Sequence, residues 1–246
     1  MALDGGRARG RNAPTMETGP RPRPEIGGIA TLGGIAFAAF GVARLASEIA
    51  EGETRAFDTG IMTALRRSGD LAQPIGPSWL PATMLDLTAL GGTAVLTLLT
   101  VLATGFLIAQ RKWRRAAFLV GAISGGALLN VVLKIGYARP RPAIVAHLVK
   151  VHDLSFPSGH AMNSAVVYLT LGVLLARAQS GRQVKLYLLG AAALLTLIVG
   201  VSRVYLGVHY PTDVLAGWTV GAGWATLCWW IAEWWRRRRP PGAPPV

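Results

Sequence analysis

The sequence predicts an all-α membrane protein: a six-transmembrane-helix bundle with an interfacial amphipathic segment between the first two spans. Two observations predict this class. Of the 246 residues, 52% are hydrophobic and only 15% are charged, whereas a soluble domain carries about 25% charged residues. The apolar residues also gather in stretches of about 20, the length at which a helix crosses a bilayer core of about 30 Å.

Six apolar stretches qualify as spans. Each is expected to be helical, because only then do its backbone hydrogen bonds close within the segment in lipid. The stretches are about Ile26–Leu45, Thr88–Gln110, Ala116–Ile135, Ala161–Ala178, Leu186–Val204 and Thr212–Trp235. Gly and Ala are frequent in them, which indicates close helix packing. We therefore expect one domain over residues 26–235.

The segment Ala46–Leu87 separates the first two spans. Phe57, Ile61, Met62 and Leu65 recur in it at helical spacing, which fits an amphipathic helix lying on the membrane surface. A small cap over the bundle fits equally well. Pro and Gly then predict an irregular turn region over residues 74–81.

Polar tails flank the domain. Residues 1–25 are rich in Gly, Pro and Arg, and residues 236–246 are basic and rich in Pro, so we expect both to be disordered. Most of the 25 Lys and Arg lie in these tails and in the connections that six crossings put on the same side. Positive charge marks the cytoplasmic side, so both termini of a multi-pass plasma or inner membrane protein are predicted to be cytoplasmic. The basic residues behind the net charge of +13 thus lie at the ends of the spans. They do not indicate a nucleic-acid site, so we expect no nucleic-acid partner.

Three short polar clusters interrupt the apolar chain, at the extracytoplasmic ends of the predicted spans. They run over Lys134–Pro142, Pro157–His160 and Ser202–Asp213. Charged groups in lipid are costly and indicate a functional site. Together the clusters supply three cations, two histidines and a carboxylate, which are the groups that hydrolysis of a phosphate ester needs.

The three cations are Lys134, Arg141 and Arg203. An arginine can contact two phosphate oxygens at once, and a lysine acts as a point charge. Ser158 is suited to cap the helix that follows it, and Gly159 lets a ligand approach the backbone. The start of that helix is a natural anion site.

His209 precedes Asp213 by four residues. If this turn is helical, the two side chains lie on one face within reach of each other. A carboxylate bonded to one imidazole nitrogen leaves the other nitrogen free to attack. Arg139 is a candidate auxiliary contact, whereas His147 and His152 are loop residues without an assigned role.

The pattern Lys-x6-Arg-Pro, Pro-Ser-Gly-His and Ser-Arg-x5-His-x3-Asp resembles the signature of the type 2 phosphatidic acid phosphatase superfamily. All three pieces are present in order between Lys134 and Asp213. The resemblance implies that His209 is the nucleophile, which forms a phosphohistidine and is oriented by Asp213. It also implies that His160 protonates the leaving alcohol. Lys134, Arg141, Arg203, Ser158 and Gly159 would hold the phosphate, without a metal or other cofactor.

The leading hypothesis is an integral-membrane phosphatase that acts on a lipid mono- or diphosphate at the extracytoplasmic face. Undecaprenyl diphosphate, phosphatidic acid and phosphatidylglycerol phosphate are candidate substrates, and an external site favours undecaprenyl diphosphate or a broad specificity. A phosphotransferase using the same histidine is one alternative. A transporter or scaffold that binds ligand without chemistry is another, although a transport path would spread charged residues across the membrane. The six spans disfavour a soluble haloperoxidase.

Overall fold

The computed structural model describes residues 24–151 and 153–238, with side chains from residue 31 onward. Helices dominate it, and one short β-hairpin interrupts them. The elements are α1 (Pro24–Glu51), α2 (Arg55–Ala64), β1 (Arg66–Arg67), β2 (Asp70–Pro74), α3 (Leu80–Ala89), α4 (Thr93–Ala109), α5 (Trp113–Tyr137), α6 (Gly159–Arg177), α7 (Arg182–Tyr205) and α8 (Pro211–Arg237). The tails that we expect to be disordered lie largely outside the described residues, although α8 continues two residues into the second tail.

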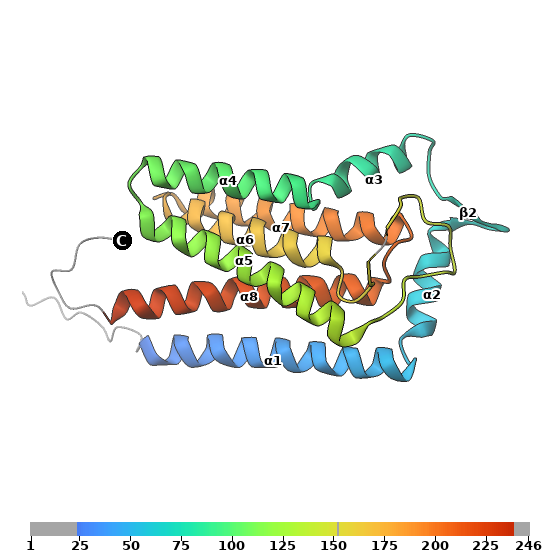
Figure 1. Ribbon diagram of the computed structural model, residues 1–246, viewed down its shortest axis with the longest axis horizontal. Coiled ribbons are helices and arrows are strands. Elements are labelled where there is room, and N and C mark those ends of the chain that lie inside the picture. The colour runs from blue at the N-terminus through green and yellow to red at the C-terminus, as the bar shows by residue number, and fades with distance from the viewer. Residues whose placement is uncertain (1–23, 152, 239–246) are drawn as a thin grey trace, which may run out of the picture.

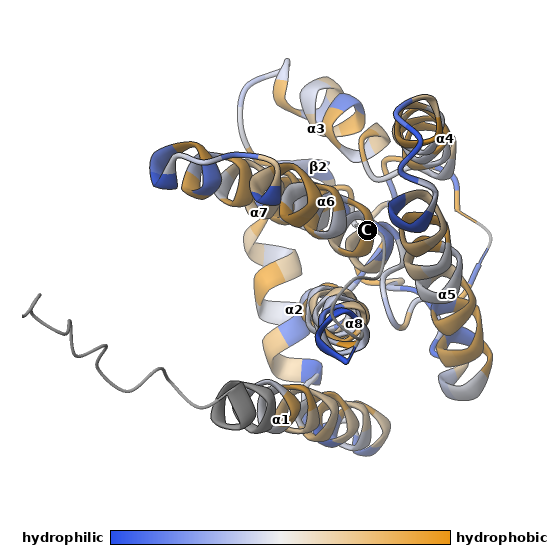
Figure 2. Cartoon of the chain, turned by 90° about the vertical axis from the view of Figure 1, so that its left-hand side faces the viewer, coloured by the Kyte–Doolittle hydropathy of each residue, from blue (hydrophilic) through white to orange (hydrophobic). Residues whose placement is uncertain are grey.

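The long helices form a bundle with α6 inside it (Figure 1, Figure 2). Helix α6 packs against α7, α8, α5 and α4. More than half of its most apolar 18-residue stretch is buried. Small residues permit this: a Cβ built on Gly172 of α6 would lie 2.8 Å from the Cβ of Ala192 on α7. Large apolar side chains such as Leu102, Phe106 and Leu128 are instead exposed on the outer helices, as expected for surfaces that face lipid.

Five helices are long and apolar enough to cross a membrane, and α3 with α4 would make a sixth span bent by 42°. The predicted stretch of about Thr88–Gln110 corresponds to the end of α3 together with α4, so a break lies near its start. The chain bends where Gly91 and Gly92 separate α3 from α4. A Cβ on Gly91 would lie 2.3 Å from Cγ1 of Val199, so this close approach to α7 requires a glycine.

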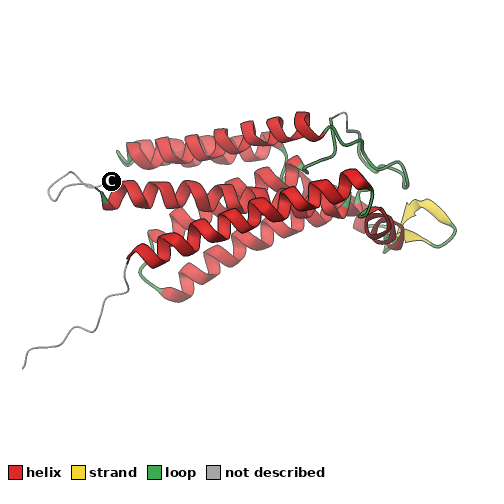
Figure 3. Ribbon diagram, turned by 90° about the horizontal axis from the view of Figure 1, so that it is seen from below, coloured by secondary structure: helices red, strands yellow, loops and turns green. Residues whose placement is uncertain are grey.

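The segment between the first two spans covers one end of the bundle. Met62 of α2 is buried and packs with Val145 and Val214, while Asp58 is fully buried. These contacts make the segment a cap over the bundle. The structure does not confirm that its helix lies at the membrane interface. Strands β1 and β2 pair as an antiparallel hairpin (Figure 3). The all-α class is confirmed, and this hairpin is a small addition to it: Gly69, with φ +86°, allows a turn that the helical spacing does not reveal.

The start of α1 and the end of α8 lie at one end of the bundle, and the connections that carry the three polar clusters lie at the other (Figure 1). The second cluster precedes α6, and the third joins α7 to α8. This arrangement follows from an even number of crossings. It brings residues almost 80 positions apart in sequence to a common end.

Two glycines let α8 lie directly on α6, next to the second cluster. A Cβ on Gly217 would lie 2.8 Å from the carbonyl oxygen of Ser158, and one on Gly221 would lie 2.6 Å from that of Met162. Neither carbonyl can move without displacing α6. Close backbone approach at glycines spaced four residues apart is typical of helix pairs in membranes.

We expect Gly221→Ala to destabilise the protein by about 1–3 kcal/mol, because the added methyl group forces α8 away from α6. Gly223→Ala is the matched control, since a Cβ on Gly223 meets no atom within 4 Å among the described residues. Thermal unfolding in detergent compares the two variants. Equal midpoints would show that the α6–α8 contact is looser than described.

Candidate active site

His209 lies in the turn between α7 and α8, and its imidazole is almost completely buried. Nδ1 lies 3.5 Å from Oδ2 of Asp213, without the geometry of a hydrogen bond. Nε2 lies 3.2 Å from Nη1 of Arg141. A guanidinium can only donate, so Nε2 is the accepting nitrogen and Nδ1 carries the proton that faces the carboxylate.

The protonation of His209 follows from its burial. Desolvation outweighs the attraction of Asp213 and lowers the pKa of His209 to about 4. The imidazole is therefore neutral at pH 7, and the lone pair of Nε2 is available. A neutral imidazole with a carboxylate at its other nitrogen has the properties of a nucleophile or general base.

The loop after α5 brings two of the predicted cations together. Lys134, in the last turn of α5, and Arg141 both form ion pairs with the carboxylate of Asp153. Arg141 also donates to the backbone oxygen of Val208, at 2.6 Å. These contacts place the first cluster against the His209 turn.

Asp153 is a residue of this site that the sequence analysis missed. Its side chain is 61% exposed, yet it pairs with two of the three cations that the sequence predicts to bind phosphate. Partial burial raises its pKa, but hydrogen bonds and charges from Lys134 and Arg141 outweigh this effect and leave the pKa well below its usual value. Asp153 is therefore ionised, and its carboxylate pairs with both cations.

The second cluster starts α6 as predicted, with one difference. Ser158 occupies the N-cap position, but its hydroxyl makes no capping bond, and its backbone N–H donates to the carbonyl oxygen of Asp213 at 3.0 Å. Gly159 lies close to Lys134, whose Cε would be 3.6 Å from an added Cβ. His160 is half-buried, close enough to His209 and Arg203 to interact with them electrostatically.

Arg203 lies in the last turn of α7 and is 3% exposed. Its Nη1 donates to Oγ1 of Thr88, at the end of α3, at 3.1 Å. Among the described residues, Nε of Arg203 and Oγ of Ser158 are buried without a hydrogen-bond partner. Buried polar atoms rarely remain unpaired, so each of these two side chains has a polar atom left for a further partner.

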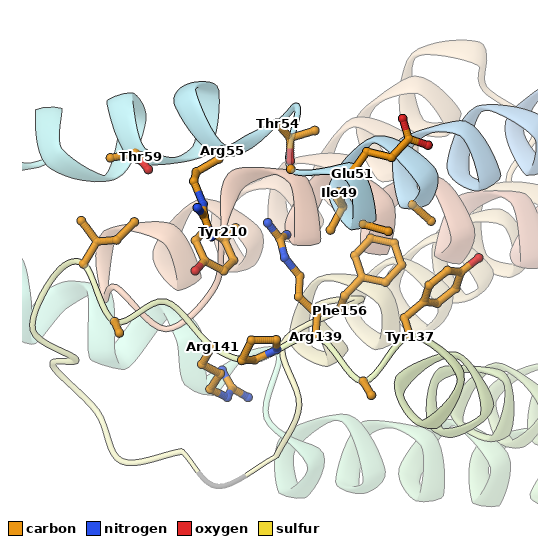
Figure 4. Close-up of a pocket in the computed structure, with 17 residues that line it drawn as sticks. Ile49, Glu51, Thr54, Arg55, Thr59, Tyr137, Arg139, Arg141, Phe156 and Tyr210 are labelled. Atoms are coloured by element: carbon orange, nitrogen blue, oxygen red, sulfur yellow. The ribbon is translucent and has the colours of Figure 1, made fainter.

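A cavity of about 940 Å³ opens beside the cluster, between the end of α1, α2 and the loop after α5. Arg139, Arg141 and Tyr210 lie in its wall (Figure 4). Arg141, which lines this cavity, is also the residue whose Nη1 lies 3.2 Å from Nε2 of His209. The cavity therefore reaches Arg141, whereas Lys134 and Arg203 are not among the residues that line it.

The comparisons with known proteins agree with this geometry. The sequence model of the PAP2 superfamily matches residues 115–237, half of the chain. The chain belongs to the PAP2 superfamily. It is 37% identical to phosphatidylglycerophosphatase B of Bacillus subtilis over 147 residues, which are 58% of this chain and 70% of that protein. It is 31% identical over 108 residues to undecaprenyl-diphosphatase BcrC of B. subtilis, covering 41% of this chain and 50% of that one.

A solved PAP2 structure has the same fold. The crystal structure of a transmembrane PAP2 type phosphatidylglycerolphosphate phosphatase from B. subtilis superposes with a TM-score of 0.74 at 30% identity. The match covers 83% of this chain and 98% of that one. Membership of a family of named phosphatases and this transmembrane fold identify the chain as a membrane enzyme that hydrolyses phosphoric esters.

The structure adds a buried ionic network behind the PAP2 motif residues. Arg139 donates to Oδ1 of Asp213 at 2.5 Å and to Oδ2 of Asp58 at 2.9 Å. Asp58 also accepts hydrogen bonds from the backbone and hydroxyl of Thr212, and Asp213 accepts one from Ser155. This network fixes the carboxylate that faces His209, and it links α2 to α8.

Arg139 was only a candidate contact from the sequence, and Asp58 was missed. One signal was available for Asp58: it lies one turn before Met62, on the side of α2 that the spacing of apolar residues marks as buried. Asp153 and Ser155 gave no such signal, because they belong to an irregular loop. His147 lies in the same loop, with Nε2 2.6 Å from the carbonyl oxygen of Pro142, and His152 lies outside the described residues.

Proposed function

We propose that this PAP2 protein hydrolyses the phosphate or diphosphate group of a membrane lipid through a phosphohistidine at His209. The observation that carries the proposal is the position of Nε2. This nitrogen is unprotonated and in contact with Arg141, while Nδ1 faces Asp213. Nε2 would attack phosphorus, and Asp213 would stabilise the positive charge that develops on the ring.

The three cations would hold the phosphoryl oxygens. Lys134 and Arg141 already bind a carboxylate, and Arg203 has an unpaired Nε. Stabilising the charge on the equatorial oxygens supplies most of the catalysis in phosphoryl transfer. We therefore expect activity to persist in EDTA, and a strict requirement for Mg²⁺ would contradict the three-cation account.

His160 would act on the other side of the phosphorus. It would protonate the leaving oxygen as the phosphohistidine forms and then accept a proton from the attacking water. The unpaired hydroxyl of Ser158, next to Gly159 at the start of α6, would donate to a phosphoryl oxygen.

The substrate class follows from the membrane fold and the relatives. The lipid would keep its acyl chains in the bilayer and present its headgroup to the cations at the capped end of the bundle. The distribution of Lys and Arg supports an extracytoplasmic position for this end, with both termini in the cytoplasm. Because one relative is a phosphatidylglycerophosphatase and another an undecaprenyl-diphosphatase, both lipid phosphates belong in the first test.

The test is a phosphate-release panel in detergent. It compares phosphatidylglycerol phosphate, phosphatidic acid and undecaprenyl diphosphate, with and without EDTA, using His209→Ala as the inactive control. We expect release from at least one lipid phosphate and none from the control. Binding of these lipids without release by the wild-type protein would indicate a non-catalytic role.

Asp153 should compete with the phosphate for the two cations. We expect Asp153→Asn to lower the inhibition constant of inorganic phosphate about fivefold, because a partly exposed ion pair contributes up to about 1 kcal/mol. Asp70→Asn is the control, since it removes the same charge from the hairpin at the same end. If inhibition by phosphate is unchanged or weaker in Asp153→Asn, the carboxylate does not compete with phosphate.

A further inference from the structure

A second cation cluster lies at the opposite end of the bundle, around Glu233. This carboxylate is 7% exposed and accepts hydrogen bonds from Arg177, Arg236 and Arg237 at 2.5–3.2 Å. One carboxylate balances only one of the three arginines. Glu233 therefore positions a cluster that keeps an excess of positive charge, among the hydrophilic helix ends that face the viewer in Figure 2.

A cavity of about 340 Å³ opens beside this cluster, between α5, α6 and α8. Its polar wall includes Arg177 and Arg236, together with Arg114 and Arg115 from the first turn of α5. That turn contains no acidic residue, and Arg114 lies at the positive end of the helix dipole, where a cation is unfavourable. An anion in the cavity would relieve this repulsion and neutralise the excess charge.

The cavity is not a purely polar site. Phe118, Val173 and Trp229 line it, and the same three residues line a second cavity of about 100 Å³, which lies deeper along the same helices. The guanidinium of Arg177 lies 5.2 Å from the ring centre of Trp229. A charged mouth therefore continues into an apolar groove, which is the shape of a lipid headgroup followed by an acyl chain.

Two unpaired donors lie along this groove. Nε1 of Trp229 and Oγ1 of Thr170 are buried and have no hydrogen-bond partner among the described residues. Thr170 is 4% exposed and lines the deeper cavity. The ester groups between the phosphate and the acyl chains of a glycerophospholipid are acceptors that such donors would bind.

We propose that this end of the bundle binds an anionic glycerophospholipid from the leaflet opposite the active site. Its phosphate would lie among Arg114, Arg177 and Arg236, and one acyl chain would follow the groove past Trp229. The site is separate from the catalytic one, because α8 alone, with 27 residues, spans roughly 40 Å. Basic pockets between transmembrane helices are suited to anionic headgroups.

Native mass spectrometry of the full chain in detergent tests the proposal, with phosphatidylglycerol and phosphatidylcholine of identical acyl chains as probes. We expect one retained phosphatidylglycerol and much weaker retention of phosphatidylcholine. Each arginine near a charged headgroup changes affinity about fivefold, so Arg114→Gln/Arg236→Gln should weaken binding roughly 25-fold. Arg177 and Arg237 remain on Glu233 in this variant.

Arg182→Gln/Lys185→Gln is the matched control, because it removes two charges at the same end, outside the cavity. Phosphatidylglycerol binding should survive in this control. It should also survive in Lys134→Gln, which lacks one of the three cations of the proposed catalytic site. Trp229→Phe keeps an aromatic ring but removes the N–H donor, so it should weaken binding by a smaller factor. The proposal would be overturned if the two double variants lost phosphatidylglycerol binding equally or if Lys134→Gln lost it. Full displacement of the lipid by millimolar inorganic phosphate would also overturn it.

Discussion

Replacing His209 with alanine is expected to reduce phosphate release by at least about 10⁴-fold, because the nucleophile and its pairing with Asp213 are lost together. The cations that bind the substrate remain, so binding of the lipid phosphate should change much less than turnover. Phosphate release under single-turnover conditions measures the chemical step directly.

His147→Ala is the matched control for this variant. His147 lies in the loop after α5, at the same end of the bundle, and Nε2 of its imidazole lies 2.6 Å from the carbonyl oxygen of Pro142. We expect near wild-type turnover from it. Residual activity of His209→Ala at the level of His147→Ala would refute the assignment of the nucleophile.

Replacing Arg139 with glutamine should have the largest effect on stability. Arg139 lies between the buried carboxylates of Asp58 and Asp213, and both would lose their cation at once. Removing one partner of a buried ion pair costs about 3–5 kcal/mol. We also expect turnover to fall, since Asp213 would no longer be held against His209.

A double-mutant cycle separates the ionic network from a general packing effect. Asp58→Asn/Arg139→Gln removes a carboxylate together with its cation, so we expect the double variant to be more stable than the sum of the two single effects predicts. Arg55→Gln is the control, because Arg55 lines the same cavity but is exposed. Additive effects in the cycle, or equal stability of Arg139→Gln and Arg55→Gln, would contradict the network.

The parts of the fold that the sequence predicts are those with strong periodic or compositional signals. Apolar stretches of about 20 residues locate the long helices, since lipid leaves the backbone no alternative. The spacing of the three polar clusters likewise identifies the candidate site, and the structure brings Lys134, Arg141, His160, Arg203 and His209 to one end of the bundle.

The remaining features depend on contacts between distant segments. The bend at Gly91 arises from the approach of α3 to α7, which no local pattern reveals. Ser158 fits the N-cap position, yet its hydroxyl is left unpaired beside the cations. Asp58 belongs to the capping segment, and its partners Arg139 and Thr212 lie about 80 and 150 residues away. Asp153 is an unremarkable loop residue until folding places it between Lys134 and Arg141.

Trapping the phosphorylated enzyme tests the central proposal most directly. Wild-type protein mixed with a ³²P-labelled lipid phosphate and quenched within the first turnover should retain label that is stable to alkali and labile to acid, as expected for a phosphohistidine. Peptide mapping should place this label on His209, and His209→Ala should retain none. Label on another residue, or rapid turnover without any trapped label, would contradict the proposal that Nε2 of His209 attacks the phosphate held by the three cations.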